Sequence, residues 1–387
     1  MTDRVTNVAV LGSTGSIGRS TLEVIGGSQG AMRAVGLSAH NSTDLLIEQA
    51  NAVRPRRVVV TDERAAERID PAALPAETEL LRGPDAVARL VTDDEIDIVV
   101  SAIVGSAGLQ GTWAALEAGK TVALANKETL VVGGPLVTRL AAEKGARLLP
   151  VDSEHSAVFQ SLQAGRRDEV RRVILTASGG PFRTFTDEQL ARVTVEDALA
   201  HPTWDMGPKI TVDSATMMNK ALEIIEARWL FDLSADQISV VIHPQSIVHS
   251  MVEYRDGSVI AQLSPPDMKL PIQYALTWPE RQEGVAAKLD FSQAIALQFD
   301  PPDFERFGAL QLGLEVARSG GTAGAVLNGA NEAAVAAFLD GQLGFHQIVP
   351  VCKSILDNHD FDPDPTLERV LELDGWARQE VLRWISA

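Results

Sequence analysis

The sequence predicts an α/β protein with a parallel sheet in its first third, a mixed α+β middle region with an antiparallel hairpin, and a helical end. Short β-branched runs alternate with helical patterns up to about residue 151, a hairpin signal follows, and the pattern is mostly helical from Asp303 onward. A chain of 387 residues exceeds what one hydrophobic core usually serves. We therefore expect three domains, at 1–151, 152–295 and 296–387.

Six runs in the first third are too short for helices and rich in β-branched residues. They are Asn7–Leu11, Arg33–Ser38, Arg57–Thr61, Ile96–Ile103, Thr121–Ala125 and Arg147–Val151. Segments between them, such as Ser42–Val53 and Leu109–Ala118, have helical spacing. This alternation predicts βαβ units and a parallel, doubly wound sheet.

The rhythm changes after about residue 152. Arg172–Ala177 is a predicted strand, and Ser214–Leu230 is a long helical pattern with Asp213 or Ser214 as its amino-terminal cap. Ser246–Leu263 alternates around a four-residue turn signal that begins at Arg255, which predicts an antiparallel hairpin.

Composition limits the possible partners. Lys and Arg number 34 against 52 Asp and Glu, and the net charge of −18 argues against nucleic acid and anionic membranes. Cys352 is the only cysteine, so no intramolecular disulfide can form, and we expect a buried, inert thiol within the helical pattern Ile348–Ile355. No signal peptide and no membrane-length apolar stretch is evident, so we expect a cytoplasmic protein.

A glycine-rich loop, Gly12–Gly18, joins the first predicted strand to the first helix. Glycines there allow a sharp turn, a close approach of the backbone to a pyrophosphate, and tight packing of helix on strand. The helix N-terminus adds N–H donors and a positive dipole end. At the first strand-to-helix turn of a βαβ series, this loop predicts a Rossmann-like dinucleotide site.

The end of the second strand distinguishes NAD from NADP. An NAD site usually has an acidic residue about 20 residues after the loop, which binds the ribose 2′-hydroxyl. Here Ser38–Ser42 contains Ser, Ala, His and Asn, and no carboxylate occurs before Asp44. Hydroxyl, imidazole and amide groups can accommodate a 2′-phosphate, so NADP(H) is favoured. The alternative is that His40 is only an exposed loop histidine.

Charged residues follow the fifth and sixth strands, at the edge of an open α/β sheet where ligands bind. They are Asn126-Lys127-Glu128 and Asp152-Ser153-Glu154. Solvation of the strand ends would explain the latter equally well. Glu223 is a third candidate carboxylate, and an all-oxygen site of this kind suits Mg²⁺ or Mn²⁺. The alternative there is a plain surface pair between Lys220 and Glu223.

A group of polar residues in the middle region has the character of an anion site. Ser178 precedes Gly179 and Gly180, an arrangement that exposes backbone N–H groups. Donors and a positive charge are added by Ser214, Asn219 and Lys220, of which Asn219 shares a helix face with Glu223. Together these residues could bind a phosphate.

These motifs, in this order, resemble the 1-deoxy-D-xylulose 5-phosphate reductoisomerase family. The matching stretches are Gly12–Gly18, Ala125–Leu130, Pro150–Ser156, Thr176–Phe182, His201–Ile210, Val212–Lys220, His243–His249, Pro266–Pro271 and Asn328–Glu332. Two departures are minor: Ala221 stands where glycine usually follows the Asn-Lys pair, and Lys269 where arginine is common.

The resemblance implies reductive isomerisation of 1-deoxy-D-xylulose 5-phosphate to 2-C-methyl-D-erythritol 4-phosphate by NADPH, in the non-mevalonate isoprenoid pathway. It implies that Asp152, Glu154 and Glu223 hold Mg²⁺ or Mn²⁺, with Co²⁺ as a further candidate. Catalytic roles are implied for Lys127, Glu154 and His201. The implied substrate contacts are Ser153, Glu154, Ser178, His201, Trp204, Ser214, Asn219, Lys220 and Glu223.

The resemblance also implies an NADPH site, a lid and a homodimer. The cofactor contacts would be Ser13, Thr14, Gly15, Ser16, Ile17, Ser38, His40, Asn41, Ala102, Asn126, Lys127, Glu128, Gly207 and Met268. The lid would span His201–Pro208, with Trp204 as its apolar cover, although core packing is the alternative for Trp204. The hairpin Ser246–Leu263 has few blunting charges away from its turn, so we expect it to pair two copies of the chain.

Two other functions remain open at this point. One is an NADP-dependent dehydrogenase acting on another phosphorylated substrate, which the third carboxylate and the phosphate cluster disfavour. The other is a non-catalytic NADP-binding protein, which would be expected to lack some of these groups.

Overall fold

The computed structural model describes residues 4–200, 204 and 206–386, which fall into two compact units. The first unit comprises Met1–Asn126, Val137–Ser156 and Asp267–Ala287. The second comprises Lys127–Leu136, Ala157–Pro266 and Lys288–Ala387. Within the described residues, no helix combines the length and the apolar character that crossing a membrane requires.

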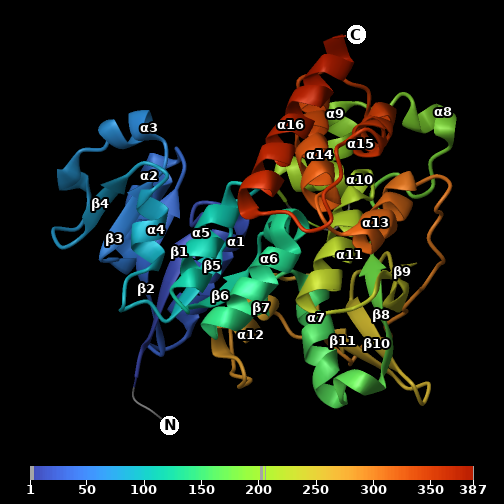
Figure 1. The fold of residues 1–387 in the computed structure, drawn as a ribbon. Coiled ribbons are helices and arrows are strands. Elements are labelled where there is room, and N and C mark those ends of the chain that lie inside the picture. The colour runs from blue at the N-terminus through green and yellow to red at the C-terminus, as the bar shows by residue number, and fades with distance from the viewer. Residues whose placement is uncertain (1–3, 201–203, 205, 387) are drawn as a thin grey trace. The chain divides into compact units, whose positions relative to one another are not determined.

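The first unit is built on a seven-stranded, wholly parallel sheet with the order β4-β3-β2-β1-β5-β6-β7 (Figure 1). The strands are β1 Thr6–Leu11, β2 Met32–Ala39, β3 Arg57–Val60, β4 Glu79–Arg82, β5 Ile98–Ser101, β6 Thr121–Leu124 and β7 Arg147–Pro150. The doubly wound prediction is confirmed, and the strand order reverses between β1 and β5. Ligand sites of such sheets lie at this reversal, beyond the carboxyl ends of the strands.

Helices cover this sheet. They are α1 Ser16–Gly27, α2 Thr43–Val53, α3 Glu63–Glu67, α4 Ala86–Val91, α5 Gly108–Glu117, part of α6 Glu128–Lys144 and α12 Lys269–Thr277. Val8 to Leu11 of β1 are fully buried, as in a strand covered on both faces.

Strand β4 was not predicted, because only Leu81 of its four residues is buried and the strand lies at the sheet edge.

The second unit contains a four-stranded mixed sheet with the order β11-β10-β8-β9. The strands are β8 Val170–Ala177, β9 Ile238–Ile242, β10 Val248–Tyr254 and β11 Val259–Leu263. The antiparallel pairing of β10 with β11 confirms the predicted hairpin. Gly257 in its turn has φ +88°, a backbone conformation that favours glycine.

The other regular elements of the second unit are helices, in addition to the start of α6. They are the end of α7 Ser153–Ser161, then α8 Asp187–Leu190, α9 Val195–Leu199, α10 Pro208–Ala215, α11 Met218–Leu230, α13 Gly308–Ser319, α14 Ala323–Leu339, α15 Ile348–Asp357 and α16 Leu367–Ser386. Single turns of 3₁₀ helix lie at Pro71–Ala73 in the first unit and at Leu162–Ala164, Arg167–Glu169, Ala235–Gln237 and Phe345–Gln347 in the second. The predicted helical end of the chain is confirmed.

One predicted helix is two. The pattern Ser214–Leu230 is divided between α10 and α11 at Met217, whose φ of +63° is rare for a residue with a side chain. The Thr216 hydroxyl donates to the carbonyls of Val212 and Asp213 and accepts from the Met218 N–H, which supports the break. The predicted cap at Asp213 or Ser214 is therefore wrong, because both residues lie inside α10.

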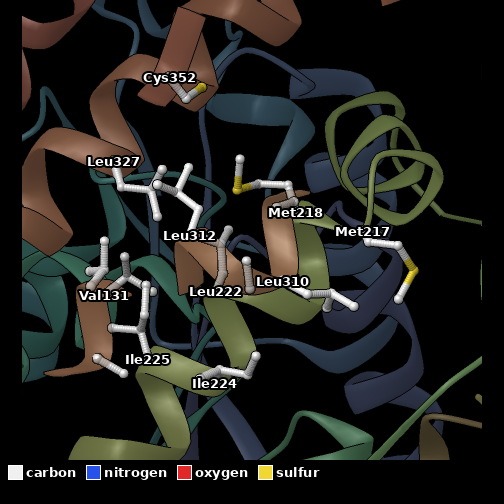
Figure 2. Packing of buried hydrophobic residues seen from close by; sticks show 14 of the residues in the cluster. Val131, Met217, Met218, Leu222, Ile224, Ile225, Leu310, Leu312, Leu327 and Cys352 are labelled. Carbon is white, nitrogen blue, oxygen red and sulfur yellow. The ribbon is translucent and has the colours of Figure 1, made fainter. Parts of the chain in front are cut away.

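The two units differ from the predicted three-domain division. Asp267–Ala287 belongs to the first unit, because α12 packs against α1, β6 and β7. Residues 157–266 and 288–387 form one unit, because their apolar side chains share one core. Figure 2 shows Leu222 of α11, Leu312 of α13, Leu327 of α14 and Cys352 of α15 in this cluster.

Close helix packing explains the departure at position 221. A Cβ on Gly313 of α13 would lie 2.9 Å from the Cβ of Ala221. Alanine is accommodated on α11 because the facing residue is glycine. The buried Cys352 thiol, whose pKa is raised by burial, agrees with the predicted inert cysteine.

The contact between α14 and α16 gives a matched pair of stability tests. A Cβ on Gly329 of α14 would lie 2.2 Å from the Asp374 carbonyl oxygen, whereas one on Gly375 of α16 meets nothing within 4 Å. We expect Gly329→Ala to lower the free energy of unfolding by about 1–3 kcal/mol, because α16 must move. Gly375→Ala should raise it by about 0.5–1 kcal/mol. Urea unfolding measures both, and equal midpoints would contradict the packing account.

Candidate active site

The glycine loop of the first unit is shaped by close backbone contacts. Gly12 has φ +74°, and a Cβ there would lie 2.6 Å from the Ala102 carbonyl oxygen, just beyond β5. A Cβ on Gly18 would lie 2.4 Å from the Gly12 carbonyl oxygen. The loop thus brings the exposed N-terminus of α1 to the strand-order reversal, with Gly15 as a cap that has no side chain. N–H groups at such a helix end suit a pyrophosphate.

Buried polar side chains fix this loop. The Gly12 N–H donates to Ser38 Oγ at 3.0 Å, and the Ser13 hydroxyl donates to Gln49 Oε1 at 2.8 Å. The Gln49 amide donates in turn to the Ser13 carbonyl at 2.9 Å. Ser13 and Ser38 therefore hold the loop in shape, whereas Thr14, Ser16 and Ile17 lie along its partly exposed edge. Their predicted cofactor contacts stay predictions.

The end of β2 is open to solvent. His40 and Asn41 are exposed, and His40 Nδ1 lies 2.9 Å from the Thr61 hydroxyl. Exposure fits both a 2′-phosphate contact and a simple loop histidine, so the two interpretations remain open. The loops beyond β5 and β6 are joined by Asn126, whose amide donates to the carbonyls of Ile103 and Gly105. Met268, half-buried, precedes α12 as its cap.

The Asp152 carboxylate, which follows β7, is oriented by a histidine that the sequence analysis did not single out. Fully buried His155 places Nδ1 3.0 Å from Asp152 Oδ1, which also accepts from the Glu154 N–H at 3.2 Å. The Ser153 hydroxyl donates to Glu154 Oε2 at 2.5 Å. Asp152, Ser153 and Glu154 are half-buried at the carboxyl edge of the sheet, so these oxygens are ordered and reachable. The signal available in the sequence was the three-residue spacing of Asp152 and His155, which places the two side chains on one face at the start of α7.

In the second unit, a charged cluster lies at the starts of α6 and α11. Lys127 Nζ donates to Asn219 Oδ1 at 2.6 Å and lies 3.6 Å from Glu223 Oε1. The Asn219 amide donates to Glu223 Oε1 at 2.6 Å, and Lys220 pairs with Glu223 Oε2. Lys220 and Glu223 are 4% and 1% exposed, so the surface-pair alternative is wrong. Removing charged groups from water costs free energy, and charged side chains buried in this way are typical of functional sites.

The predicted anion-binding loop lies against α10. Gly179 and Gly180 have φ +85° and +66°, and the Gly180 N–H donates to the Ser178 hydroxyl at 3.3 Å. A Cβ on Gly180 would lie 2.7 Å from the Ser214 carbonyl oxygen. The structure thus brings the Ser178 loop to the end of α10, one turn before Asn219 and Lys220.

A second ion-paired group, missed by the sequence analysis, lies beside this cluster. Lys209 Nζ lies 2.9 Å from Glu128 Oε1 and 2.8 Å from Asp213 Oδ2. Burial opposes the charged form of both partners. Nevertheless, the Lys209 ammonium lowers the pKa of Glu128, while the Asp213 and Glu128 carboxylates raise the pKa of Lys209. The sequence offered no signal for the Lys209–Glu128 pair, because these two residues are 81 positions apart along the chain.

The predicted lid is described only in part. His201 lies outside the described residues, so its catalytic and substrate-binding roles stay predictions. Trp204 is half-buried, with its ring centroid 6.5 Å from that of His249. This leaves both the cover and the core-packing interpretations open. Gly207 is exposed and caps α10.

Comparison with known proteins identifies relatives along the whole chain. Family profiles match residues 8–134 (1-deoxy-D-xylulose 5-phosphate reductoisomerase), 148–231 (its C-terminal domain) and 263–380 (DXP reductoisomerase C-terminal domain). The chain is 51% identical to 1-deoxy-D-xylulose 5-phosphate reductoisomerase of Rhodopirellula baltica, over 97% of this chain and 94% of that protein. It is 52% identical to the enzyme of the same name from Chlorobium chlorochromatii, over 96% and 97%.

Solved structures agree with these relatives. The reductoisomerase of Zymomonas mobilis in complex with NADPH is 43% identical, with a TM-score of 0.92 over 99% of this chain and 100% of that one. A DOX-P reductoisomerase in complex with NADPH, fosmidomycin and magnesium is 41% identical, with a TM-score of 0.93 over 99% and 98%.

The glycine loop can be tested by adding one methyl group. Gly12→Ala should force the loop away from Ala102 and weaken NADPH binding by about tenfold or more, equivalent to about 1.4 kcal/mol. Gly26→Ala, on the same loop-and-helix unit but with no atom within 4 Å of the new Cβ, is the matched control. Fluorescence titration with NADPH measures both. Equal affinities would place the pyrophosphate elsewhere.

Proposed function

Because the chain belongs to the 1-deoxy-D-xylulose 5-phosphate reductoisomerase family, we propose that it converts 1-deoxy-D-xylulose 5-phosphate to 2-C-methyl-D-erythritol 4-phosphate with NADPH. This reaction belongs to non-mevalonate isoprenoid biosynthesis. The observation that carries the proposal is the buried cluster of Lys127, Asn219, Lys220 and Glu223. A dehydrogenase without isomerase chemistry would have no evident use for these groups. In a non-catalytic protein, burying them would cost desolvation energy without any functional benefit.

We further propose that Asp152 and Glu154 of the first unit act with Glu223 of the second as ligands of Mg²⁺ or Mn²⁺. Carboxylate oxygens are the donors that these hard ions prefer, and His155 already orients Asp152. A bound ion would supply Lewis acidity that polarises the ketone and stabilises negative charge on its oxygen.

The chain's own groups divide the remaining work. The Ser178–Gly180 loop, Ser214, Asn219 and Lys220 would bind the phosphate through hydroxyl, amide, backbone N–H and ammonium donors. The Lys127 ammonium, held by Asn219, would stabilise negative charge that develops on the substrate as one carbon–carbon bond breaks and another forms. NADPH, when bound, would supply the hydride that reduces the resulting aldehyde. The Gly12–Gly18 loop would hold the pyrophosphate of that cofactor.

The function is tested by NADPH oxidation with 1-deoxy-D-xylulose 5-phosphate, with and without EDTA. We expect turnover that EDTA abolishes and Mg²⁺ restores. Glu223→Gln should lower kcat roughly 10²–10³-fold, as expected for loss of an electrostatic contact to the reacting groups. Its affinity for NADPH should be nearly unchanged, and the exposed Glu305→Gln is the matched control. Undiminished activity after chelation would contradict the proposed metal site.

We also propose that the active form is a homodimer paired through β11. This edge strand has no charged residue, and its Val259, Ile260 and Leu263 are exposed by 48%, 37% and 37%. Unblunted apolar edges pair readily with another strand. The cytoplasmic location stays a prediction.

The dimer has a direct test. Light scattering at micromolar concentration should give about twice the 41.5 kDa mass of one chain. Ile260→Lys should shift the mass toward one chain, because an ammonium would be placed on the paired edge. Leu382→Lys changes an exposed apolar residue on α16, away from β11 in the sequence, and should leave the mass unchanged. A monomeric wild type, or a dimer insensitive to Ile260→Lys, would refute the pairing.

A further inference from the structure

Two neighbouring residues at the start of α6 are anchored to two successive helices of the second unit. Lys127 Nζ donates to Asn219 Oδ1 on α11, and Glu128 Oε1 accepts from Lys209 Nζ on α10. The backbone of Lys127 is also fixed, because its carbonyl accepts the N–H groups of Leu130 and Val131 at the first turn of α6. Lys127 and Glu128 thus share one turn of backbone, so a shift of Glu128 would also move the backbone from which the Lys127 side chain extends.

Lys209 is itself fixed from the far side. Asp213, one turn later on α10, lies 2.8 Å from Lys209 Nζ through Oδ2, and its Oδ1 accepts from the Asn331 amide at 2.8 Å. Asp213 and Asn331 are 1% and 0% exposed. Asn331 belongs to the Asn328–Glu332 stretch of α14, which the proposed reaction leaves without a role. The resulting chain, Glu128–Lys209–Asp213–Asn331, runs from the start of α6 to the middle of α14.

We propose that Lys209 is a positioning residue, which holds Glu128 and thereby keeps the Lys127 ammonium aimed at Asn219 and Glu223. Stability alone does not account for a charged pair at this position, because buried ion pairs give little net stability and apolar replacements often serve as well. An ion pair does fix direction, because both partners lose a favourable arrangement if either rotates. The assignment of Lys127 to the reacting groups rests on the proposed function; the positioning of its side chain does not.

The raised pKa of Lys209 and the lowered pKa of Glu128 agree with this geometry. Glu332 adds a third carboxylate near the Lys209 ammonium, and Arg378 partly offsets it through a 2.9 Å pair with Glu332. Both partners of the Lys209–Glu128 pair thus stay charged across the neutral range. The Lys209–Glu128 ion pair, which we call the clamp, is therefore present whenever the enzyme works near neutral pH.

The first test measures the exposure of the Lys127 amine and needs no substrate. Trace acetylation followed by mass spectrometry gives a labelling rate for each lysine. In Lys209→Met we expect Lys127 to react roughly fivefold faster or more, because local opening costs less without the clamp. Lys120, held in the first unit by the carbonyls of Asp93 and Ile96, reports general loosening and should not change. Lys353→Met removes an exposed pair with Asp357 and is the control variant.

The outcomes separate clearly. Faster labelling of Lys127 alone supports the clamp. An unchanged Lys127 rate, or an equal rise at Lys120, overturns it. If Lys209→Met fails to fold, Glu128→Gln removes the same ion pair from the other partner and carries the same expectation for Lys127.

The second test asks whether Lys209 acts through Lys127. Lys209→Met should lower kcat roughly tenfold to a hundredfold, as small misplacements of a catalytic group do. In a Lys127→Met background, the same change should have almost no further effect, whereas independent effects would multiply. Multiplying effects overturn the proposal. A wild type that does not turn over this substrate refutes the proposed function instead, and the labelling rates still decide the clamp.

Discussion

The burial of several charged groups constrains the second unit more than any other feature. Glu223, Lys220, Lys127 and Asp213 are all nearly removed from water, and a buried charge without a partner is severely destabilising. Each charge must therefore meet an opposite charge or a hydrogen-bond donor at a defined distance. The starts of α6 and α11, the body of α10 and the middle of α14 supply those partners. The placement of these helices relative to one another follows from the need to give every buried charge a partner.

This requirement gives the break at Met217 a physical meaning. A continuous helix from Pro208 to Leu230 would carry Asp213 and Asn219 on one axis. The left-handed residue instead ends α10 and starts α11 in a new direction. Asp213 then faces Asn331, whereas Asn219 and Glu223 face Lys127. Strained backbone of this kind persists where surrounding contacts over-determine it, often at functional sites.

In the first unit, the corresponding constraint is steric. Gly12 and Gly18 approach neighbouring backbone so closely that a single methyl group at either position would displace the loop. Ser13, Ser38 and Gln49 satisfy the polar groups that this compact turn buries. The loop is therefore shaped before any ligand arrives. Pre-shaped donors are worth more to a bound anion than donors that must be ordered on binding.

The sequence by itself determined the parallel sheet, the glycine loop, the hairpin and the helical end, because each depends on local spacing and turn chemistry. It also pointed to the residue types at the strand ends, since a charge after a buried strand is visible in one dimension. It did not reveal β4, whose single buried side chain leaves no periodic signal. It gave no hint of the break at Met217, because methionine is an ordinary helix residue.

Only the tertiary structure decided which charges meet. Lys209 is 81 residues from Glu128 along the chain, and Asn331 is 118 from Asp213, so no spacing rule connects them. Burial likewise distinguished the enclosed Lys220–Glu223 pair from the surface pair that the same spacing allows. The physical reason is common to these cases. The energy of a charge depends on its solvent exposure and on its neighbours in three dimensions, and both are properties of the folded chain rather than of its order.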